Sequence, residues 1–331
     1  MEIKIKIPPA QPKISAKADS MAANIGHVPE KVTCCASKEP EGEGIAQIFQ
    51  EIDQLIGLKE VKSMIYEVHA FTQIQKKRLE QSLVAQPTVL HAIFKGNPGS
   101  GKTTVARLMA RLYKEMGVLT KGHLVEVERA DLVGEFIGHT AQRTKEQVKK
   151  AIGGVLFIDE AYSLCRGGEK DFGREAIDVL VKAMEDNRNN FVLILAGYNK
   201  EMDYFLTSNP GLNSRFPLHI NFPDYSLQEL MQIAEHLYKQ HQYSPNNFAW
   251  AEMEKSLTTL LADQGQNHGN ARTIRNIVEA SLRTQAVRLM RLETLGKDEL
   301  EGINAEDITS AVSKAVKYPS KREGRILSMG M

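Results

Sequence analysis

The strongest constraint on this chain is one glycine-rich stretch, Gly96-Asn97-Pro98-Gly99-Ser100-Gly101-Lys102-Thr103, which fits the phosphate-loop pattern G-x-x-x-x-G-K-[ST] throughout. A strand-like apolar run, Val89–Phe94, precedes it, and apolar residues at helical spacing follow over Thr104–Leu112. In this order the backbone N–H groups of the loop and the N-terminus of the helix can point at the same phosphate. A glycine turn that holds no ligand is the alternative, and the flanking elements argue against it.

The residues of this stretch are expected to divide the work of holding a nucleoside triphosphate. Lys102 should reach the β- and γ-phosphates, and Thr103 should hold Mg²⁺. The other nucleotide-binding positions expected here are Asn97, Pro98, Gly99, Ser100, Gly101 and Thr104.

A second signal is the apolar run Val155–Ile158, which is followed directly by Asp159 and Glu160. It places both carboxylates at the carboxyl end of a predicted strand, where open α/β sheets bind their ligands. Asp159 is expected to bind Mg²⁺ or its water shell. Glu160 is expected to polarise the water that attacks the γ-phosphate, because hydrolysis needs a positioned water rather than covalent chemistry. The alternative is that these acidic residues only cap a helix.

Further apolar runs predict a parallel sheet of five strands. After the strand before the phosphate loop, the predicted strands are His123–Glu128, Val155–Ile158, Phe191–Ala196 and Leu218–Phe222. Helical patterns lie between them, which favours right-handed crossovers and the three-layer α/β fold of P-loop NTPases. Beyond Asp224 no strand pattern returns, and apolar stripes at helical spacing predict a small all-helical domain with Ser226 as its first N-cap.

These patterns divide the chain into four parts. We expect a flexible tail over residues 1–44, a nucleotide-binding α/β domain with preceding helices over 45–224, a helical domain over 225–318 and a basic tail over 319–331. The alternation at Met1–Ile7 is typical of a short strand, and equally of a segment that orders only against a partner.

Composition excludes several classes of protein. The net charge of +1 gives no overall field that would favour nucleic acid or an anionic membrane. No run of about eighteen apolar residues predicts a membrane span, and the N-terminus lacks an apolar secretion signal. Three cysteines make no disulfide framework, so a reducing cytoplasm is the expected location.

Together, the phosphate loop, the acidic strand end and the helical domain resemble the AAA+ ATPases over about residues 45–316. Finer resemblance to the CbbX-type branch of that family lies in Leu132–Ala141, Phe157–Leu164, Ala196–Tyr198 and Ser208–Arg215. That branch contains red-type Rubisco activases and a sporulation protein of endospore formers, and the N-terminal extension is more similar to the sporulation protein. The resemblance implies a ring of subunits, usually six, that uses ATP and Mg²⁺ to remodel a protein.

The resemblance also implies roles for single residues. Ile56, Gly57 and Leu58 match the segment that packs on adenine, although Gly57 is also a plausible hinge between helices. Asn199 matches a sensor that orients the attacking water, with Tyr198 as the competing candidate.

Two arginines complete the implied site. Arg215 matches the arginine finger that reaches the γ-phosphate of a neighbouring subunit, and a surface ion pair is its alternative. Arg272 matches the second sensor, carried by the helical domain, with Arg275 as a weaker candidate.

Phe136 lies where the family has its central-pore loop, and an exposed aromatic ring there can grip a polypeptide. An ordinary buried phenylalanine is the alternative. A nucleic-acid motor or loader is the second class of function, against which the net charge and the missing basic aromatic platform argue. A P-loop kinase or monomeric switch is the third, and it would need neither arginine.

Overall fold

The computed structural model describes residues 43–86, 89–136, 138–166, 172–208, 210–264, 269–292 and 294–317. Helix α1 begins at Glu43, two residues inside the segment expected as a tail. The expectations for residues 1–42 and 319–331 lie outside the described residues.

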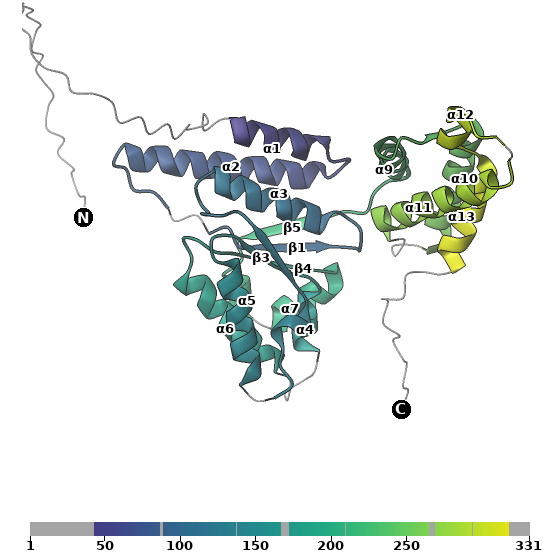
Figure 1. Cartoon of the computed structure of the whole chain (residues 1–331). Helices are drawn as coiled ribbons and strands as arrows, with labels where there is room; N and C mark the ends of the chain where they lie inside the picture. The colour runs from purple at the N-terminus through teal and green to yellow at the C-terminus, as the bar shows by residue number, and fades with distance from the viewer. Residues whose placement is uncertain are drawn as a thin grey trace, which may run out of the picture. The chain divides into compact units, whose positions relative to one another are not determined.

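A five-stranded parallel sheet with the strand order β2-β3-β4-β1-β5 forms the centre of the α/β part (Figure 1). Its strands are β1 (Ala92–Gly96), β2 (Leu124–Val127), β3 (Val155–Ile158), β4 (Val192–Gly197) and β5 (Leu218–Phe222). Strand β1 lies between β4 and β5, with Ala92 in register with both Ile194 and Leu218. Because every pair is parallel, all carboxyl ends meet at one edge, where such sheets bind ligands. The predicted fold class is confirmed.

Helices cover both faces of the sheet (Figure 1). One face is covered by α1 (Glu43–Gln54), α2 (Lys59–Glu80) and α3 (Lys102–Glu115). The other is covered by α4 (Arg129–Leu132), α5 (His139–Ala151), the 3₁₀ turn η1 (Ala161–Cys165), α6 (Gly173–Asp186), α7 (Asn199–Ser208) and α8 (Pro210–Asn213). None of the helices described here combines the length and the apolar character that crossing a bilayer would need.

Strand β3 shows why its sequence is continuously apolar. Val155 and Phe157 pack on the side of α1–α3, whereas Leu156 and Ile158 pack on the side of α5–α7. Alternate side chains point to opposite faces, and both faces are buried, so no position tolerates a polar residue. Each such buried side chain stabilises the fold by about 1.5–3 kcal/mol. This packing fixes the strand end from which Asp159 and Glu160 extend.

The C-terminal part is helical (Figure 1). Its elements are α9 (Leu227–Gln240), β6 (Ser244–Pro245), α10 (Asn247–Gln264), α11 (Asn270–Leu289), α12 (Lys297–Glu301), β7 (Gly302–Ile303) and α13 (Ala305–Lys317). Ser226 caps α9 as predicted, because its Oγ accepts from the Glu229 N–H while the Glu229 carboxylate accepts from the Ser226 N–H. The expectation that no strand follows Asp224 needs one correction, since β6 and β7 pair in parallel. Two residues are too few to carry an alternating pattern.

Candidate nucleotide-binding site

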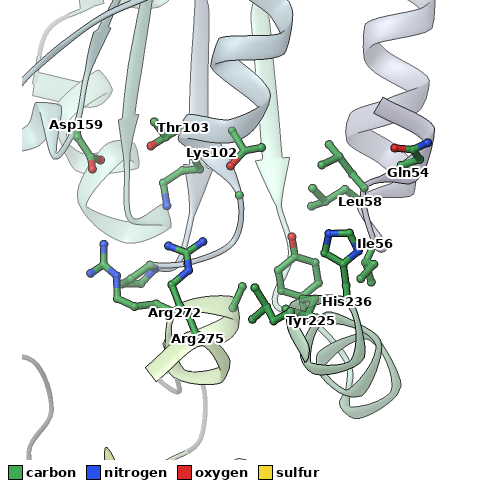
Figure 2. A pocket seen from close by; sticks show the side chains of 18 of the residues that line it. Gln54, Ile56, Leu58, Lys102, Thr103, Asp159, Tyr225, His236, Arg272 and Arg275 are labelled. Carbon is green, nitrogen blue, oxygen red and sulfur yellow. The ribbon is translucent and has the colours of Figure 1, made fainter. Parts of the chain in front are cut away.

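A cavity of about 490 Å³ opens at the carboxyl edge of the sheet (Figure 2). Its wall combines the phosphate loop, the end of β3, the segment before α2, and helices α9 and α11. Figure 2 shows Arg272 and Arg275 near Lys102, while Leu58, Tyr225 and His236 lie at the other end. The cavity therefore has one charged end and one largely apolar end, and its size is that of an ordinary small-molecule site.

Hydrogen bonds hold the Lys102 side chain at the charged end of the cavity. Its Nζ donates to the carbonyl oxygens of Gly96 and Asn97, each at 2.8 Å, and its side chain is buried. Burial lowers the pKa of Lys102 to about 8, because a low-dielectric surrounding disfavours the ammonium, and the nearby Asp159 carboxylate opposes that shift. A phosphate anion beside Nζ would raise this pKa again, because an adjacent negative charge favours the ammonium.

The remaining residues of the phosphate loop separate into two groups. The residues that line the cavity are Pro98, Gly99, Gly101, Lys102, Thr103 and Thr104. Ser100 is instead fully buried, and its Oγ donates to the Asn97 carbonyl at 2.8 Å. The Asn97 side chain donates to the carboxylate of Asp224. Asn97 and Ser100 thus shape the loop, whereas their neighbours face the cavity.

Asp159 and Glu160 both line the cavity beyond the end of β3. Glu160 adopts a left-handed backbone with φ of 47°, which is uncommon outside glycine and of the kind that costs about 1 kcal/mol or more. Its N–H donates to Asp159 Oδ1 at 3.0 Å. The turn lets two adjacent residues of the chain face one cavity, although neighbours on a strand point to opposite faces.

The oxygen donors fit Mg²⁺. The Thr103 hydroxyl and the Asp159 carboxylate share the cavity wall, and Mg²⁺ is usually held by one or two protein oxygens together with water and phosphate. Within the described part of the chain, no group of three or more His, Cys, Asp or Glu side chains gathers as a metal site. The donor set is therefore that of an ion bound mainly through a nucleotide.

Ile56 and Leu58 line the apolar end, as expected from their resemblance to an adenine-binding segment. Gly57, between them, has φ of 65°, and a Cβ there would lie 2.4 Å from Glu229 Oε1. Leu58 is also left-handed, with φ of 55°. The positive φ therefore favours glycine where the segment turns toward α9, and the roles of Gly57 as a hinge or as an adenine contact stay predictions.

Several residues of this end were missed from the sequence. They are Gln54, Tyr225, Ile233, His236, Leu237 and Gln240. Ile233 and Leu237 belong to the apolar stripe of α9, which predicts only a core-facing helix. Tyr225 donates its hydroxyl to the Ser100 carbonyl at 3.3 Å, and burial raises its pKa to about 12. A signal was present only in the position of Tyr225, directly after Asp224 at the end of the predicted sheet.

The structure distinguishes the two sensor candidates. Tyr198 lies on the cavity wall with Gly197, the last residue of β4. Its ring centroid is 5.7 Å from that of Tyr162. Asn199 instead is exposed as the first residue of α7 and does not line the cavity. Of the two candidates only Tyr198 lines the cavity, and the sensor role of either residue stays a prediction.

The two predicted arginines have different surroundings. Arg272 lines the cavity, as does Arg275. Arg215 does not, and it pairs instead with Glu185, to whose Oε1 its Nη2 and Nε donate at 2.6 and 3.1 Å. Its Nη1 donates to the Gly211 carbonyl at 2.6 Å. Within one chain the surface ion pair is what is observed.

Phe136 is 64% exposed, so the alternative of a buried core residue is wrong. Its ring meets that of His139 edge to face, with centroids 5.4 Å apart. Ile137 lies outside the described residues.

Comparison with protein families gives two adjoining matches. Residues 92–224 match the model of the "ATPase family associated with various cellular activities (AAA)", and residues 226–317 match an "AAA lid domain". Both matched parts contribute to the cavity wall, which also includes Gln54, Leu55, Ile56 and Leu58 before them.

Curated relatives match along most of their length. The chain is 51% identical to "Stage V sporulation protein K" of Bacillus subtilis, over 80% of this chain and 83% of that protein. It is 45% identical to "Protein CbbX" of Cereibacter sphaeroides, over 82% and 89%. It is 44% identical to the chloroplastic ribulose bisphosphate carboxylase/oxygenase activase of Cyanidioschyzon merolae, over 80% and 91%.

Among solved structures, the FIGL-1 AAA domain in complex with ADP is similar, with a TM-score of 0.55. The match covers 79% of this chain and 82% of that one, at 16% sequence identity. Identity this low supports the shared fold and nothing finer.

Proposed function

The chain belongs to the AAA family of ATPases and carries the lid domain of that family, and from this membership we propose that it forms a ring that uses Mg²⁺ and ATP to remodel a protein. The proposed role resembles that of its sporulation relative, in endospore formation. The observation that carries the ring is the place of Arg215. This arginine matches the family's finger, yet it lies outside the cavity of its own chain, so it would complete the site of a neighbour.

The proposed division of labour follows the cavity wall. Lys102 and the loop N–H groups hold the β- and γ-phosphates, while Thr103 and Asp159 hold Mg²⁺, which neutralises phosphate charge when bound. Glu160 polarises the attacking water, and Tyr198 orients it. Arg272 meets the phosphates from the lid. The neighbour's Arg215 stabilises the charge that grows in the transition state.

The remaining parts of the proposal concern partners and boundaries. We place the nucleotide-binding domain at 45–224 and the lid at 225–318. The chain would form a cytoplasmic homo-oligomer, and resemblance to the family implies six subunits. The exposed Phe136 supports a role in gripping an extended protein substrate. Specific nucleic-acid binding is not part of the proposal, since the net charge is only +1.

A Rubisco-remodelling role is the second candidate. It is supported by the 44% identity to a named activase, against 51% to the sporulation protein. Deleting the gene in an endospore-forming host and restoring it as wild type or Glu160→Gln tests the first role. An ATP-dependent rise in the activity of an inactive red-type Rubisco on addition of this protein tests the second. ATPase stimulation by single-stranded DNA that disappears with salt would favour a nucleic-acid motor over both.

The core of the proposal is tested by two variants of the cavity. Lys102→Ala should lose ATP binding, because it removes the phosphate contact. Glu160→Gln should still bind ATP but hydrolyse it at about one hundredth of the wild-type rate or below, because the change affects only the attacking water. Fluorescent-nucleotide titration and steady-state ATPase assays measure both, and sedimentation velocity with ATP reports assembly. Wild-type turnover by Glu160→Gln would refute the assignment of that carboxylate.

A further inference from the structure

Within the lid, helix α11 begins directly beside the phosphate loop, at Asn270. This first residue of α11 is 1% exposed and has a left-handed backbone with φ of 47°. Its Nδ2 donates to Asp224 Oδ1 at 2.7 Å and to the Pro98 carbonyl at 3.4 Å. Its Oδ1 accepts from the Tyr225 N–H at 3.0 Å. One buried amide thus joins the loop, the connection after β5 and the lid.

Asp224 extends the connection to the start of the loop. Its two carboxylate oxygens accept from Asn97 Nδ2 at 3.0 and 2.9 Å, while Oδ1 also accepts from Asn270. The three side chains form a chain of hydrogen bonds around one carboxylate. Hydrogen bonds to a charged acceptor are about twice as strong as neutral ones, so removing one member leaves a partly buried charge under-solvated.

The backbones are equally close. The Ala271 N–H donates to the Gly99 carbonyl at 3.3 Å. A Cβ on Gly99 would lie 2.4 Å from the Gly269 carbonyl oxygen and 2.8 Å from the backbone nitrogen of Arg272. No side chain fits at position 99, so the backbone of the phosphate loop lies directly against the first turn of α11.

We propose that Asn270 is a positioning residue for ATP hydrolysis, which with Asp224 fixes Arg272 over the phosphate loop. Arg272 follows two residues later on the same turn and lines the cavity. The inference rests on the proposed function, since Arg272 acts only on a bound nucleotide. The same hydrogen bonds, through Asp224 and Asn97, would couple the position of the lid to the phosphate loop that holds the nucleotide.

Asparagine is the side chain that meets every demand of this position. The left-handed backbone favours asparagine and aspartate among non-glycine residues. The position needs a donor toward Asp224 and an acceptor for the Tyr225 N–H. Aspartate keeps the shape and the acceptor but places a second carboxylate against Asp224.

This conflict suggests an exchange experiment with Asn270→Asp, Asp224→Asn and the double variant. Each single change sets like groups against each other, two carboxylates or two amide donors. In the double variant one carboxylate again faces one amide at the contact between positions 224 and 270. We expect each single variant to lose about tenfold in kcat, because misplacing a group by about 1 Å can cost up to about 100-fold. The double variant should recover to within about threefold of wild type.

The readouts separate positioning from folding. Affinity for fluorescent ADP should change by less than about threefold in all three variants, since ADP lacks the γ-phosphate that Arg272 would meet. In an Arg272→Ala background, Asn270→Asp should add little further loss, because both act through one contact. Asn246→Ala is the matched control: its Oδ1 caps α10 by accepting from the Ala249 N–H at 2.8 Å. It should leave kcat unchanged.

Two results would overturn the inference. One is wild-type kcat in Asn270→Asp, and the other is losses that multiply with Arg272→Ala. Equal losses of kcat and of melting temperature in the single variants and in Asn246→Ala would also reduce the network to a structural role. If instead the wild type neither binds nor hydrolyses ATP, the proposed function fails, and that outcome is visible before any variant is made.

Discussion

Arg272 and Arg215 are both expected to meet a triphosphate, yet the chain holds them in different ways. Arg272 lies in the cavity on a helix whose first residue is buried and hydrogen-bonded to the phosphate loop. Arg215 lies outside the cavity, in an ion pair whose side chains are 36% and 60% exposed. An exposed ion pair of this kind is worth about 0–1 kcal/mol and is easily exchanged for another anion. Folding of the single chain therefore places Arg272 in the cavity. Arg215 lies outside it, in a weak ion pair that assembly with another subunit could break.

Under the proposed function, this difference would divide the nucleotide site into a part that one chain completes and a part that a neighbouring subunit supplies. Lys102, Asp159 and Glu160 belong with Arg272 in the first part. If the division is real, loss of Arg272 and loss of Arg215 must behave differently when subunits are mixed.

Arg215→Ala should lower kcat by about 1000-fold while leaving nucleotide affinity unchanged, because the guanidinium acts on charge that grows in the transition state. ATPase assays and fluorescent-nucleotide titration measure the two quantities. Mixing this variant with Lys102→Ala should restore activity, since a Lys102→Ala subunit still lends its own Arg215. Arg188→Ala, at an exposed arginine near the end of α6, is the control. No recovery despite verified subunit exchange would count against action in trans.

Arg272→Ala should lower kcat by about 100-fold, the usual loss for one stabilising donor. Here mixing with Lys102→Ala should give no recovery. The intact Arg272 of the partner serves only the cavity of its own chain, which lacks Lys102. Recovery as large as that of Arg215→Ala would show that the lid also serves a neighbour, and the contrast between the two arginines would disappear.

Phe136, like Arg215, is proposed to act on another molecule, and Phe136→Ala tests this. Because Phe136 is exposed, its removal should change the free energy of unfolding by no more than about 0.5 kcal/mol. Basal ATP hydrolysis should stay near wild type, while work on a protein substrate is lost. The matched control is Phe205→Ala on α7, a buried phenylalanine whose loss should cost about 3–5 kcal/mol. A comparable drop in melting temperature in both variants would contradict the pore role.

Glu185→Gln should have the smallest effect. The change removes the charge that holds Arg215 in the single chain, so stability should fall by less than about 1 kcal/mol. In assembled protein kcat should rise by up to about threefold, because Arg215 no longer has to break its ion pair with Glu185 before it can reach the γ-phosphate of the neighbouring subunit. A loss of hydrolysis as deep as that of Arg215→Ala would mean that Glu185 places the arginine rather than competing for it.

Much of the fold and the charged end of the site was predictable. The pattern around Lys102 and the run before Asp159 are contiguous in sequence, and each is tied to one element boundary. The boundary predictions were accurate where an apolar run was buried on both faces, as at Val155–Ile158. They were less accurate at β1, which was expected over Val89–Phe94 and lies at Ala92–Gly96. There Val89 and Leu90 are apolar but precede the strand, and the strand continues through Lys95 and Gly96, which an apolar run does not include.

The apolar end and the connection to the lid were not predictable. Asp224 and Asn270 are 46 residues apart in the sequence, and Asn97 and Asp224 are 127 apart. Nothing local marks such residues as partners, since each has the composition of an ordinary turn or helix start. Likewise, Ile233 and Leu237 have the periodicity of any core-facing helix.

The sequence therefore predicted the chemistry, because phosphate binding and water activation depend on short runs in which neighbouring backbone groups act together. It also established the family, which the comparisons confirm. Which side chains share one cavity was settled only by folding. Tyr198 rather than Asn199 faces that cavity because of the direction in which the chain leaves β4, and Glu160 faces it through a left-handed turn. Such directions depend on packing between distant elements, which no single run of residues encodes.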